Sequence, residues 1–537
     1  MKKQLIQYLL ILILIIAPKI GLSIGMPVYP IIFVHGLVGS DLTFEETMDF
    51  LVDKYSMDGV NIFDIILNAD NNTTECSLLD VKWENWNYEN DDGNFYINVG
   101  RKHFDEEEDN FIDGWIESHI FAINFKEERI EGAAGGGFEN DLFDESNQSA
   151  IVKQGYALRK LIEEVLYYTN KEKVILVGHS MGGLAIREYL QRTNDGTNNS
   201  IHSWWVNPND SISGHKVAKV VTIGTPHLGS NMLEIPFQND DESINFDGRS
   251  NFWELNLNSE AIRDLRYNYN IFGLQGRYLY GGSENSAEWL TFGFNNFDVN
   301  CDGDQDDLIA GINEGENGTT FNSQMHLPNN ISYTWITSDD ELFIGGDGVV
   351  DLDRQWLYDD SEPPNSTPIN VSDTLLTRRT HITEGSDYRS ILRGLDEPDE
   401  MSNAFELQQS QLNMMEGEYL NGFTTYQPYM NSFDTDYFKF TSTSTGIATI
   451  NFGGVWNSDF QIAVYNGNGN IIDQYNDGGT SGQLSFSVFN EETYYFSFSS
   501  VVTSNSYLHP YHFTIDISND PVQADYFSYR DMIIEPS

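Results

Sequence analysis

One stretch of the chain reads Val174-Ile175-Leu176-Val177-Gly178-His179-Ser180-Met181-Gly182-Gly183. It opens with a continuous apolar run, which is typical of a strand buried on both faces of a parallel sheet. The pattern G-x-S-x-G follows, and residues 181–192 continue with helical spacing. Glycines in this motif allow a sharp strand-to-helix turn that lifts the serine hydroxyl above the sheet. The flanking strand and helix disfavour a chance pentapeptide, so we predict that Ser180 is a nucleophile.

Apolar runs and helical patterns alternate on both sides of this motif, from about residue 28 to residue 395. Residues 151–168 carry apolar side chains at the spacing of one helix face. Such alternation predicts an α/β fold, in which helices flank a mostly parallel sheet. We expect strands at residues 31–34, 121–125, 174–177, 217–223 and 331–336 and near residue 371.

Two kinds of segment interrupt the alternation. Residues 84–114 and 136–147 are acidic and rich in Asn and Gly, and we expect them to be long surface loops. Residues 230–330 contain aromatic and apolar residues without a clean strand period, which indicates an insertion over the sheet. The α/β domain is therefore predicted over residues 24–400, with this insertion inside it.

The pattern changes after about residue 400. Apolar residues alternate there at a period of two, and turn sequences such as Asn466-Gly467-Asn468-Gly469 separate the runs. We predict a separate all-β sandwich over residues 419–518, between a linker (401–418) and a tail (519–537). Its arrangement, opening at Asp434-Thr435-Asp436-Tyr437-Phe438, resembles the pre-peptidase C-terminal domains of secreted bacterial hydrolases. The alternating positions are Phe460, Ile462, Val464, Tyr494, Phe496, Phe498, Tyr511, Phe513, Ile515 and Ile517.

The first residues predict export. Two lysines precede an apolar run from Leu9 to Ala17, and small residues follow at Gly21 and Ser23. That order is typical of a secretory signal peptide, here residues 1–23. The alternative is an uncleaved anchor helix, but the run is short for a span of about 20 residues. We therefore expect a secreted, extracellular protein with no transmembrane segment after signal removal.

Acidic residues dominate the composition. The 537 residues include 82 Asp and Glu against 29 Lys and Arg, a net charge of −53. Phosphate backbones repel such a chain, so no nucleic-acid partner is expected. Apolar residues make up 40%, which allows a sizeable core and excludes a wholly disordered chain. Cys76 and Cys301 allow one disulfide at most, and the sequence does not show whether they pair.

A serine nucleophile of this fold needs an acid and then a histidine further along the chain. Among the later histidines, His381 is the expected base. The others are misplaced: His202, His215 and His227 lie at the next strand, His326 precedes the strand that should carry the acid, and His509 and His512 lie in the predicted sandwich.

Asp347 is the expected acid. It follows the strand at residues 331–336 by a short loop, and glycines on both sides let the backbone present its carboxylate to a histidine. An ordinary turn aspartate is the alternative reading, and three acids are rivals for the role: Asp351, Asp353 and Asp373.

Ester hydrolysis also needs hydrogen-bond donors for a tetrahedral oxyanion. We expect the backbone N–H of Met181, which follows the nucleophile, and that of Leu37, in the loop after the strand at residues 31–34. His35, in the same loop, is expected to hold the loop by hydrogen bonding.

Taken together, these motifs resemble those of the α/β-hydrolase lipases. The likeness rests on four motifs and the later His381: His35-Gly36-Leu37, Gly178-His179-Ser180-Met181-Gly182-Gly183, Gly224-Thr225-Pro226-His227-Leu228-Gly229-Ser230 and Asp347-Gly348-Val349-Val350. The resemblance implies an α/β-hydrolase fold and a secreted, triacylglycerol-lipase-like carboxylic-ester hydrolase that works on ester or lipid substrate, at a lipid–water interface. It also implies a lid, here residues 230–300, with an apolar lining supplied by Phe252, Trp253, Leu255, Leu257 and Ile262. Deacylases of glycosylphosphatidylinositol anchors and lipid acyltransferases carry similar motifs.

One acidic segment predicts calcium binding. Oxygen-bearing side chains recur on alternate residues around Gly303, as in the first nine positions of an EF-hand loop. The twelfth position is Ile309 instead of the usual glutamate, so Asp307 or Glu314 would have to complete the site. A solvated acidic turn is the alternative, and no cofactor is expected for catalysis. The expected ligands of a structural Ca²⁺ are Asp298, Asn300, Asp302, Asp304 and Asp306.

Three functions follow from the sequence. The first is a serine esterase or lipase that acts through Ser180, Asp347 and His381. The second is acyl transfer, through the same residues, to an alcohol other than water. The third is an inactive surface-binding protein, which the complete set of three residues disfavours.

Overall fold

The computed structural model forms two compact units. In the part of the chain that it describes, one unit comprises residues 29–52 and those between 58 and 396, and the other comprises residues 24–28, 53–55 and those between 397 and 518. The described residues are 24–37, 39–55, 59–68, 82–85, 96–105, 110–113, 116, 118–128, 143–144, 149, 151–191, 216–227, 229–230, 261, 265, 268–271, 274–277, 327–328, 331–339, 346–355, 371–398, 401, 404–414, 418–427, 432–433, 435–454, 460–479, 481–500 and 508–518.

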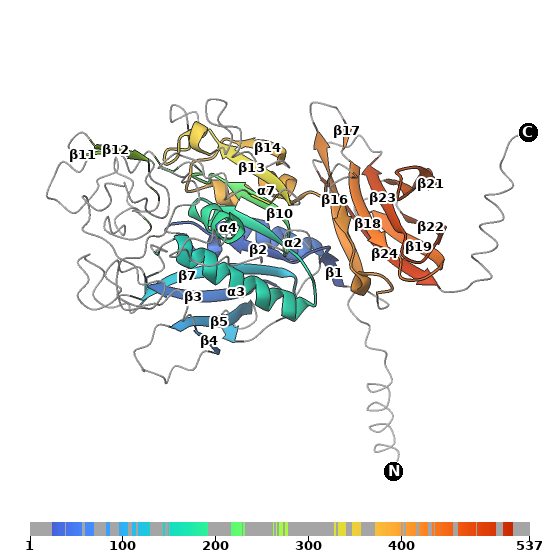
Figure 1. Ribbon diagram of the computed structural model, residues 1–537, viewed down its shortest axis with the longest axis horizontal. Helices are drawn as coiled ribbons and strands as arrows, with labels where there is room; N and C mark the ends of the chain where they lie inside the picture. The colour runs from blue at the N-terminus through green and yellow to red at the C-terminus, as the bar shows by residue number, and fades with distance from the viewer. Residues whose placement is uncertain are drawn as a thin grey trace, which may run out of the picture. The chain divides into compact units, whose positions relative to one another are not determined.

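The first unit is built on one twisted sheet (Figure 1). Its strands lie in the order β14 (Val371–Thr377), β13 (Ser332–Ser338), β10 (Val217–Ile223), β9 (Val174–His179), β2 (Ile31–Val34), β7 (Ile120–Glu128), β3 (Asn61–Asn68), β5 (Tyr96–Asp105), β4 (Lys82–Asn85). From β14 to β3 every neighbouring pair is parallel, so the strands end at the same edge. The predicted α/β fold is confirmed.

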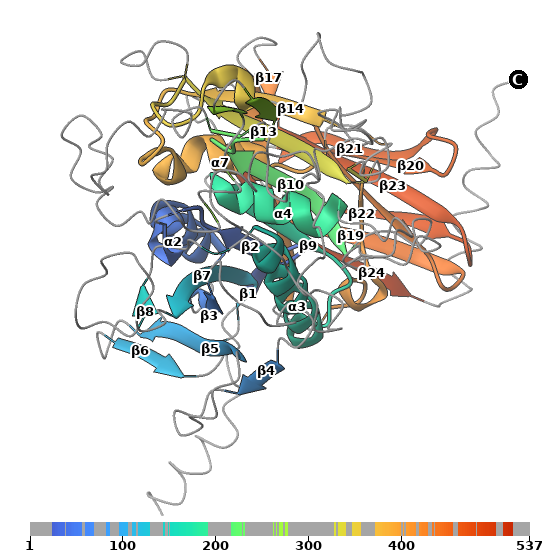
Figure 2. The ribbon, with the colours of Figure 1, turned by 60° about the vertical axis from the view of Figure 1, so that its left-hand side comes forward.

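Helices supply the crossovers that parallel strands require. The helix α3 (Ile151–Thr169) connects to β9, and α4 (Met181–Gln191) follows β9 directly. They lie side by side over the sheet (Figures 1 and 2). Strands β2 and β9 are buried throughout, as their continuous apolar runs predict. Within the described residues, the other helices of this unit are η1 (Asp41–Phe44), most of α2 (Glu45–Tyr55), η4 (Leu352–Arg354), η5 (Glu384–Ser386) and α7 (Tyr388–Leu395).

The expectation of long loops over residues 84–114 and 136–147 is wrong in part. The first contains β5, which pairs antiparallel with β3, and β6 (Asn110–Asp113), and the second contains β8 (Phe143–Asp144), which pairs with β7. Composition misled here because pairing with a distant strand satisfies backbone groups whatever the local charge. The predicted insertion likewise contains a hairpin of β11 (Asn268–Ile271) and β12 (Leu274–Arg277).

The second unit contains two mostly antiparallel sheets, as predicted for a sandwich. One contains β1 (Ile24–Pro27), β16 (Glu418–Gln427), β24 (Leu508–Ser518), β19 (Gly446–Gly454) and β22 (Ser481–Val488), with β17 (Ser432–Phe433) beside β16. The other contains β15 (Phe405–Glu406), β18 (Thr435–Thr441), β23 (Thr493–Ser500), β20 (Phe460–Asn466) and β21 (Ile471–Gly479). The alternation at a period of two correctly predicts buried positions, because Phe460, Ile462 and Val464 are all buried.

The edges of this unit differ from the sequence division. Strand β1 pairs in parallel with β16, so residues 24–27 belong to the sandwich sheet rather than to the α/β unit. The segment expected as a linker, 401–418, contains β15 and η7 (Gln409–Gln411). The pairings of β1 with β16 and of β15 with β18 join residues that are distant in sequence, so the local pattern cannot predict them. The proposed signal peptide and the tail at 519–537 lie outside the described residues.

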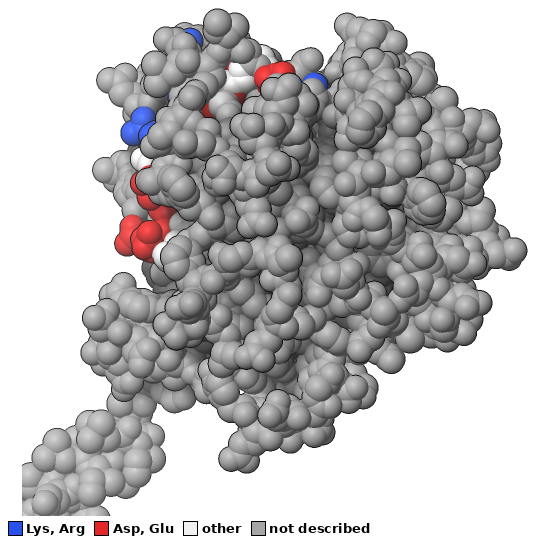
Figure 3. Space-filling view, turned by 90° about the vertical axis from the view of Figure 1, so that its left-hand side faces the viewer, with Lys and Arg blue, Asp and Glu red and all other residues white. Residues whose placement is uncertain are grey.

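Figure 3 shows described charged side chains on one face of the molecule. Acidic ones lie at its left edge and near its top, and a few basic ones lie close to them. Within the described residues, no helix is both long and apolar enough to cross a membrane.

Candidate active site

Ser180 stands at the turn between β9 and α4. Its φ is +52°, in the left-handed region, which costs about 1–3 kcal/mol for a residue other than glycine. Close packing holds the turn in place. A Cβ on Gly182 would lie 2.2 Å from the carbonyl oxygen of Val34, so only glycine lets α4 approach β2 this closely. The backbone N–H of Ser180 also donates to the carbonyl of Ile223 in β10 (3.0 Å). This is the strained strand–turn–helix geometry that the motif predicts.

His381 lies in the loop after β14 and faces Ser180. Its Nε2 is 2.7 Å from Ser180 Oγ, and its Nδ1 is 2.9 Å from Asp347 Oδ2. In the neutral imidazole, the Nδ1–H donates to the carboxylate and Nε2 accepts from the serine hydroxyl. The structure thus brings together the three residues that the sequence singled out, although up to 201 positions separate them.

Four hydrogen bonds hold the carboxylate of Asp347, which is fully buried. Its Oδ1 accepts the backbone N–H groups of Val349 and Val350, each at 2.8 Å, and its Oδ2 accepts from Gln355 Nε2 at 3.2 Å as well as from His381. Gln355 is fixed in turn by Ser338, whose N–H donates to its Oε1 and whose carbonyl accepts from its Nε2. Nothing in the sequence pattern singles out Gln355. Of the rivals, Asp351 lies at the N-terminus of η4, while the side chains of Asp353 and Asp373 lie outside the described set.

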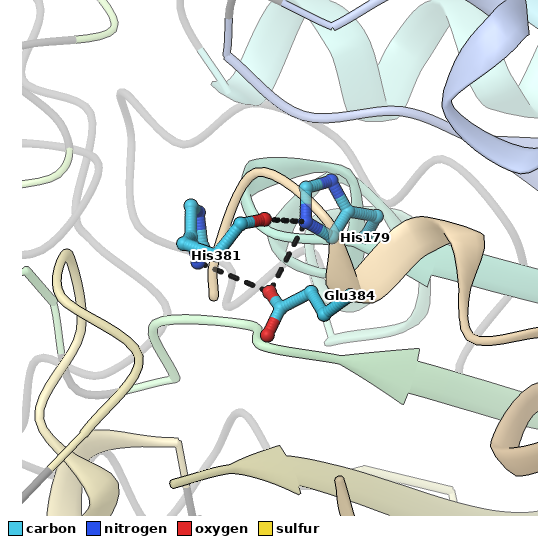
Figure 4. A group of neighbouring side chains, drawn as sticks. All are labelled: His179, His381 and Glu384. Atoms are coloured by element: carbon cyan, nitrogen blue, oxygen red, sulfur yellow. Dashed lines mark hydrogen bonds and ion pairs between the residues drawn. The ribbon is translucent and has the colours of Figure 1, made fainter. Parts of the chain in front are cut away.

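A second buried carboxylate, which the sequence analysis missed, lies beside His381 (Figure 4). Glu384 Oε1 is 3.0 Å from His381 Nδ1 and 3.1 Å from His179 Nε2. The same His179 nitrogen is 3.0 Å from the backbone carbonyl of His381, so its N–H donates to both oxygens. The position of Glu384, three residues after His381, was a possible signal in the sequence. No sequence signal indicated its contact with His179, which lies 205 positions away.

The two acids oppose the effect of burial on the imidazole. Burial disfavours the charged form, but Asp347 and Glu384 outweigh it and raise the pKa of His381 to about 10. Burial raises the pKa of Asp347, against the attraction of His381. For Glu384 the net shift is downward. Burial alone would raise its pKa, but the charge of His381 and the hydrogen bonds from His179 and His381 lower it by more. The site therefore stabilises an imidazolium, the form that a general base reaches after taking a proton.

His179, His381 and Glu384 could also be read as metal ligands, because one ligand atom from each lies within 4.8 Å of the other two. These residues already contact one another and Asp347 through hydrogen bonds and an ion pair. A hydrogen-bonded chain is the simpler account of the cluster.

The loop that carries Leu37 packs directly on the serine turn. A Cβ on Gly36 would lie 2.5 Å from Ser180 Cβ and 3.0 Å from the N of Met181. This contact brings the segment with the expected oxyanion donors, Leu37 and Met181, next to the nucleophile. His35 anchors the loop, because its Nε2 accepts the N–H of Phe125 at 2.8 Å. Burial lowers the pKa of His35 to about 4 and keeps it neutral.

Part of the predicted insertion reaches the same place. Leu265 and Ala261 are buried in one apolar cluster with Met181 and Leu184, and Leu37 packs against it. The expected lid residues Phe252, Trp253, Leu255, Leu257 and Ile262 lie outside the described residues. So do both cysteines and the expected calcium ligands Asp298, Asn300, Asp302, Asp304 and Asp306.

Known proteins resemble this chain in sequence and in structure. Residues 150–234 match the family model described as Lecithin:cholesterol acyltransferase, a segment that includes Ser180. No curated protein sequence matches the chain. Among solved structures, lipase BlEst2 of Bacillus licheniformis in propeptide form is 13% identical, with a TM-score of 0.30 over 93% of this chain and 77% of that one.

Two further structures are similar to parts of the chain. The product of gene lin2722 from Listeria innocua is 13% identical, with a TM-score of 0.29 over 68% of this chain and 91% of its own. The pre-peptidase C-terminal domain of a Bacillus anthracis collagenase is 14% identical, with a TM-score of 0.17 over 22% of this chain and 98% of its own. The architecture assigned above rests on the strands and helices themselves.

Proposed function

We propose that this protein is a secreted, triacylglycerol-lipase-like serine hydrolase of carboxylic esters. One observation carries the proposal: a continuous hydrogen-bonded chain from Ser180 Oγ through His381 to Asp347, with links of 2.7 and 2.9 Å. Distances of this length are those required for a nucleophile, a general base and an orienting acid. The match to the acyltransferase family over residues 150–234 supports a lipid-acting enzyme.

The reaction would proceed in two steps. His381 Nε2 takes the proton of Ser180 as Oγ attacks the ester carbonyl, and the N–H groups of Met181 and Leu37 bind the oxyanion. The imidazolium then gives its proton to the departing alkoxide, leaving an acyl group on Ser180. A water molecule, deprotonated by the same imidazole, releases the acid and restores the serine.

The surroundings of Ser180 favour an apolar acyl group. Met181 and Leu184, which follow the serine in α4, are fully buried against Leu265. An alkyl chain placed here would gain by leaving water, because burial of each CH₂ group is favourable by about 0.8 kcal/mol. A lipid at a lipid–water interface is the partner that this environment fits.

Hydrolysis of p-nitrophenyl esters of graded chain length tests the proposal. We expect Ser180→Ala to lower kcat by about 10⁶-fold, while Ser485→Ala, in the sandwich strand β22, leaves activity unchanged. A long-chain optimum would indicate a lipase, and a short-chain optimum an esterase. Equal cleavage by wild type and Ser180→Ala would refute the proposal and favour a protein that only binds surfaces.

Transfer to an alcohol other than water is the second candidate, favoured by the family match at residues 150–234. The same acyl-enzyme would then react with a lipid hydroxyl, and phospholipids or glycosylphosphatidylinositol anchors could be the acyl donor. Product analysis with an added alcohol distinguishes the two: ester formation in excess of free acid supports transfer.

Secretion and calcium binding extend the proposal. Export rests on the sequence of residues 1–23, and N-terminal sequencing of the exported protein would locate the cleavage site. The prediction of calcium binding rests on the oxygen-bearing side chains at alternate residues from Asp298 to Asp306. Removal of Ca²⁺ with a chelator should lower the melting temperature and leave the chemistry at Ser180 intact. An unchanged melting temperature would remove the calcium site.

A further inference from the structure

The geometry points to Glu384 as a positioning residue: a second carboxylate that holds the His381 imidazole together with Asp347 and sets the pH range in which it serves as a base. This inference rests on the proposed function, because it concerns the same imidazole. It adds a fourth side chain to the hydrogen-bonded chain and gives His179 the role of orienting that side chain.

The contacts of Glu384 connect two segments of the site. Its Oε1 lies 3.0 Å from His381 Nδ1 and 3.1 Å from His179 Nε2 (Figure 4). His179 directly precedes the nucleophile, and its Nε2–H also donates to the carbonyl of His381. Glu384 therefore links the serine turn to the histidine loop through side chains, independently of Asp347.

The fold leaves a space for this carboxylate at the end of β10. A Cβ on Gly224 would lie 1.5 Å from Glu384 Oε1, and the φ of Gly224 is +56°. On the other side, a Cβ on Gly385 would meet Thr43 Cγ2 at 2.6 Å, so η5 is packed against η1. Both neighbours must be glycine for Glu384 to remain where it contacts His381.

Burial makes the charge of Glu384 depend on His381. The side chain is fully buried, and within the described residues its Oε2 has no hydrogen-bond partner. A buried carboxylate is costly unless a cation pairs with it, and the His381 imidazolium is the cation in contact. The imidazolium is thus stabilised by two anions instead of one.

The other titratable groups nearby leave this role to Glu384. Asp347 is the partner acid, and His179 donates to Glu384. Asp387, in the next turn, caps α7 and accepts from Thr377 and Ser390. His35, which lies near His179, is held neutral by burial.

Two acids should move the working range of the enzyme to higher pH. Since His381 acts as a base only when neutral, a raised pKa means that activity appears only as the pH approaches that value. Replacement of Glu384 by Gln removes one anion, so the pKa of His381 should fall. The acid limb of the pH profile should then move to lower pH by about one to three units.

The experiment follows the rate of Ser180 labelling by an alkyl fluorophosphonate across about pH 5–11. This probe reports the base without requiring the natural ester. Wild type is compared with Glu384→Gln, and with Asp387→Asn as a control that removes a nearby carboxylate from outside the site. We expect the acid limb of Glu384→Gln to shift downward and that of Asp387→Asn to stay within a few tenths of a unit.

The outcomes separate this inference from the proposed function. If Ser180 is labelled and the acid limb of Glu384→Gln coincides with that of wild type, the inference is overturned and the proposed function stands. If Ser180→Ala cleaves esters as wild type does, the proposed function fails. Thermal unfolding checks that the variant is folded. If Glu384→Gln does not fold, the acid limb of the wild-type pH profile is the test. An apparent pKa near the ordinary histidine value of 6.5 overturns the inference.

Discussion

The nucleophile side and the base side of the site are built in different ways. Ser180 is held by main-chain geometry: β9, a left-handed turn and α4 follow one another within a few residues, and glycines permit the contacts. His381, Asp347 and Glu384 are held by side-chain hydrogen bonds between loops that follow two different strands. The first arrangement depends on sterics and the second on charge and hydrogen bonding. A substitution at the packed glycines of the nucleophile side should therefore disturb the fold, whereas one on the base side should chiefly disturb the chemistry.

On the base side, the largest effect on activity is expected from His381→Ala. This change removes the base and the group that connects Ser180 to both acids, so kcat should fall by about 10⁴–10⁶-fold. The buried Asp347 and Glu384 lose their shared partner, so the melting temperature should also fall, while the fraction that stays folded should be inactive. Ester hydrolysis and thermal unfolding, measured on the same preparation, check both parts. A large loss of stability with full activity in the folded fraction would contradict the comparison.

Gly182→Ala is expected to act on the fold. The added Cβ would lie 2.2 Å from the carbonyl oxygen of Val34, which the backbone can relieve only by moving α4 away from β2. We expect a loss of about 3 kcal/mol in the free energy of unfolding, measured by urea denaturation. The matched control is Gly467→Ala in the turn after β20, where the nearest atom, Thr493 O, is 3.3 Å away. There the loss should stay below about 1 kcal/mol, and equal losses at the two positions would contradict the steric argument.

Gln355→Met should give the smallest effect. The substitution keeps the volume but removes the donor to Asp347 Oδ2 and both hydrogen bonds with Ser338. Asp347 retains its two backbone donors and His381, so kcat/KM should fall only about tenfold. The value of kcat/KM near the pH optimum, compared with that of wild type, measures this loss. A loss as large as that of His381→Ala would mean that Gln355 is needed to form the site at all.

The nucleophile side was predictable from the sequence because its determinants are local. The apolar run before Gly178 and the helical spacing after Met181 each follow from neighbouring residues, and the structure has β9 and α4 at those places. The sandwich alternation was predictable for the same reason. The acidic segment at 84–114 was misjudged because β5 is stabilised by pairing with β3, some tens of residues away.

The base side was predictable only as a choice among candidates. Chain order left His381 and favoured Asp347, but the rivals Asp351, Asp353 and Asp373 could not be dismissed by pattern. Glu384 and Gln355 were missed, since a glutamate or glutamine in a loop carries no periodic signal. Their contacts depend on side-chain packing between segments that the chain order does not bring together.

By itself, the sequence determined the α/β and all-β architecture and the position of Ser180, because strand, turn and helix follow from residues within a few positions of one another. Only the tertiary structure decided which acids face His381, that His179 and Glu384 connect the two sides, and that residues 24–27 join the sandwich sheet. The physical reason is that hydrogen bonds and ion pairs form between atoms about 3 Å apart, and that proximity is set by the packing of the whole sheet.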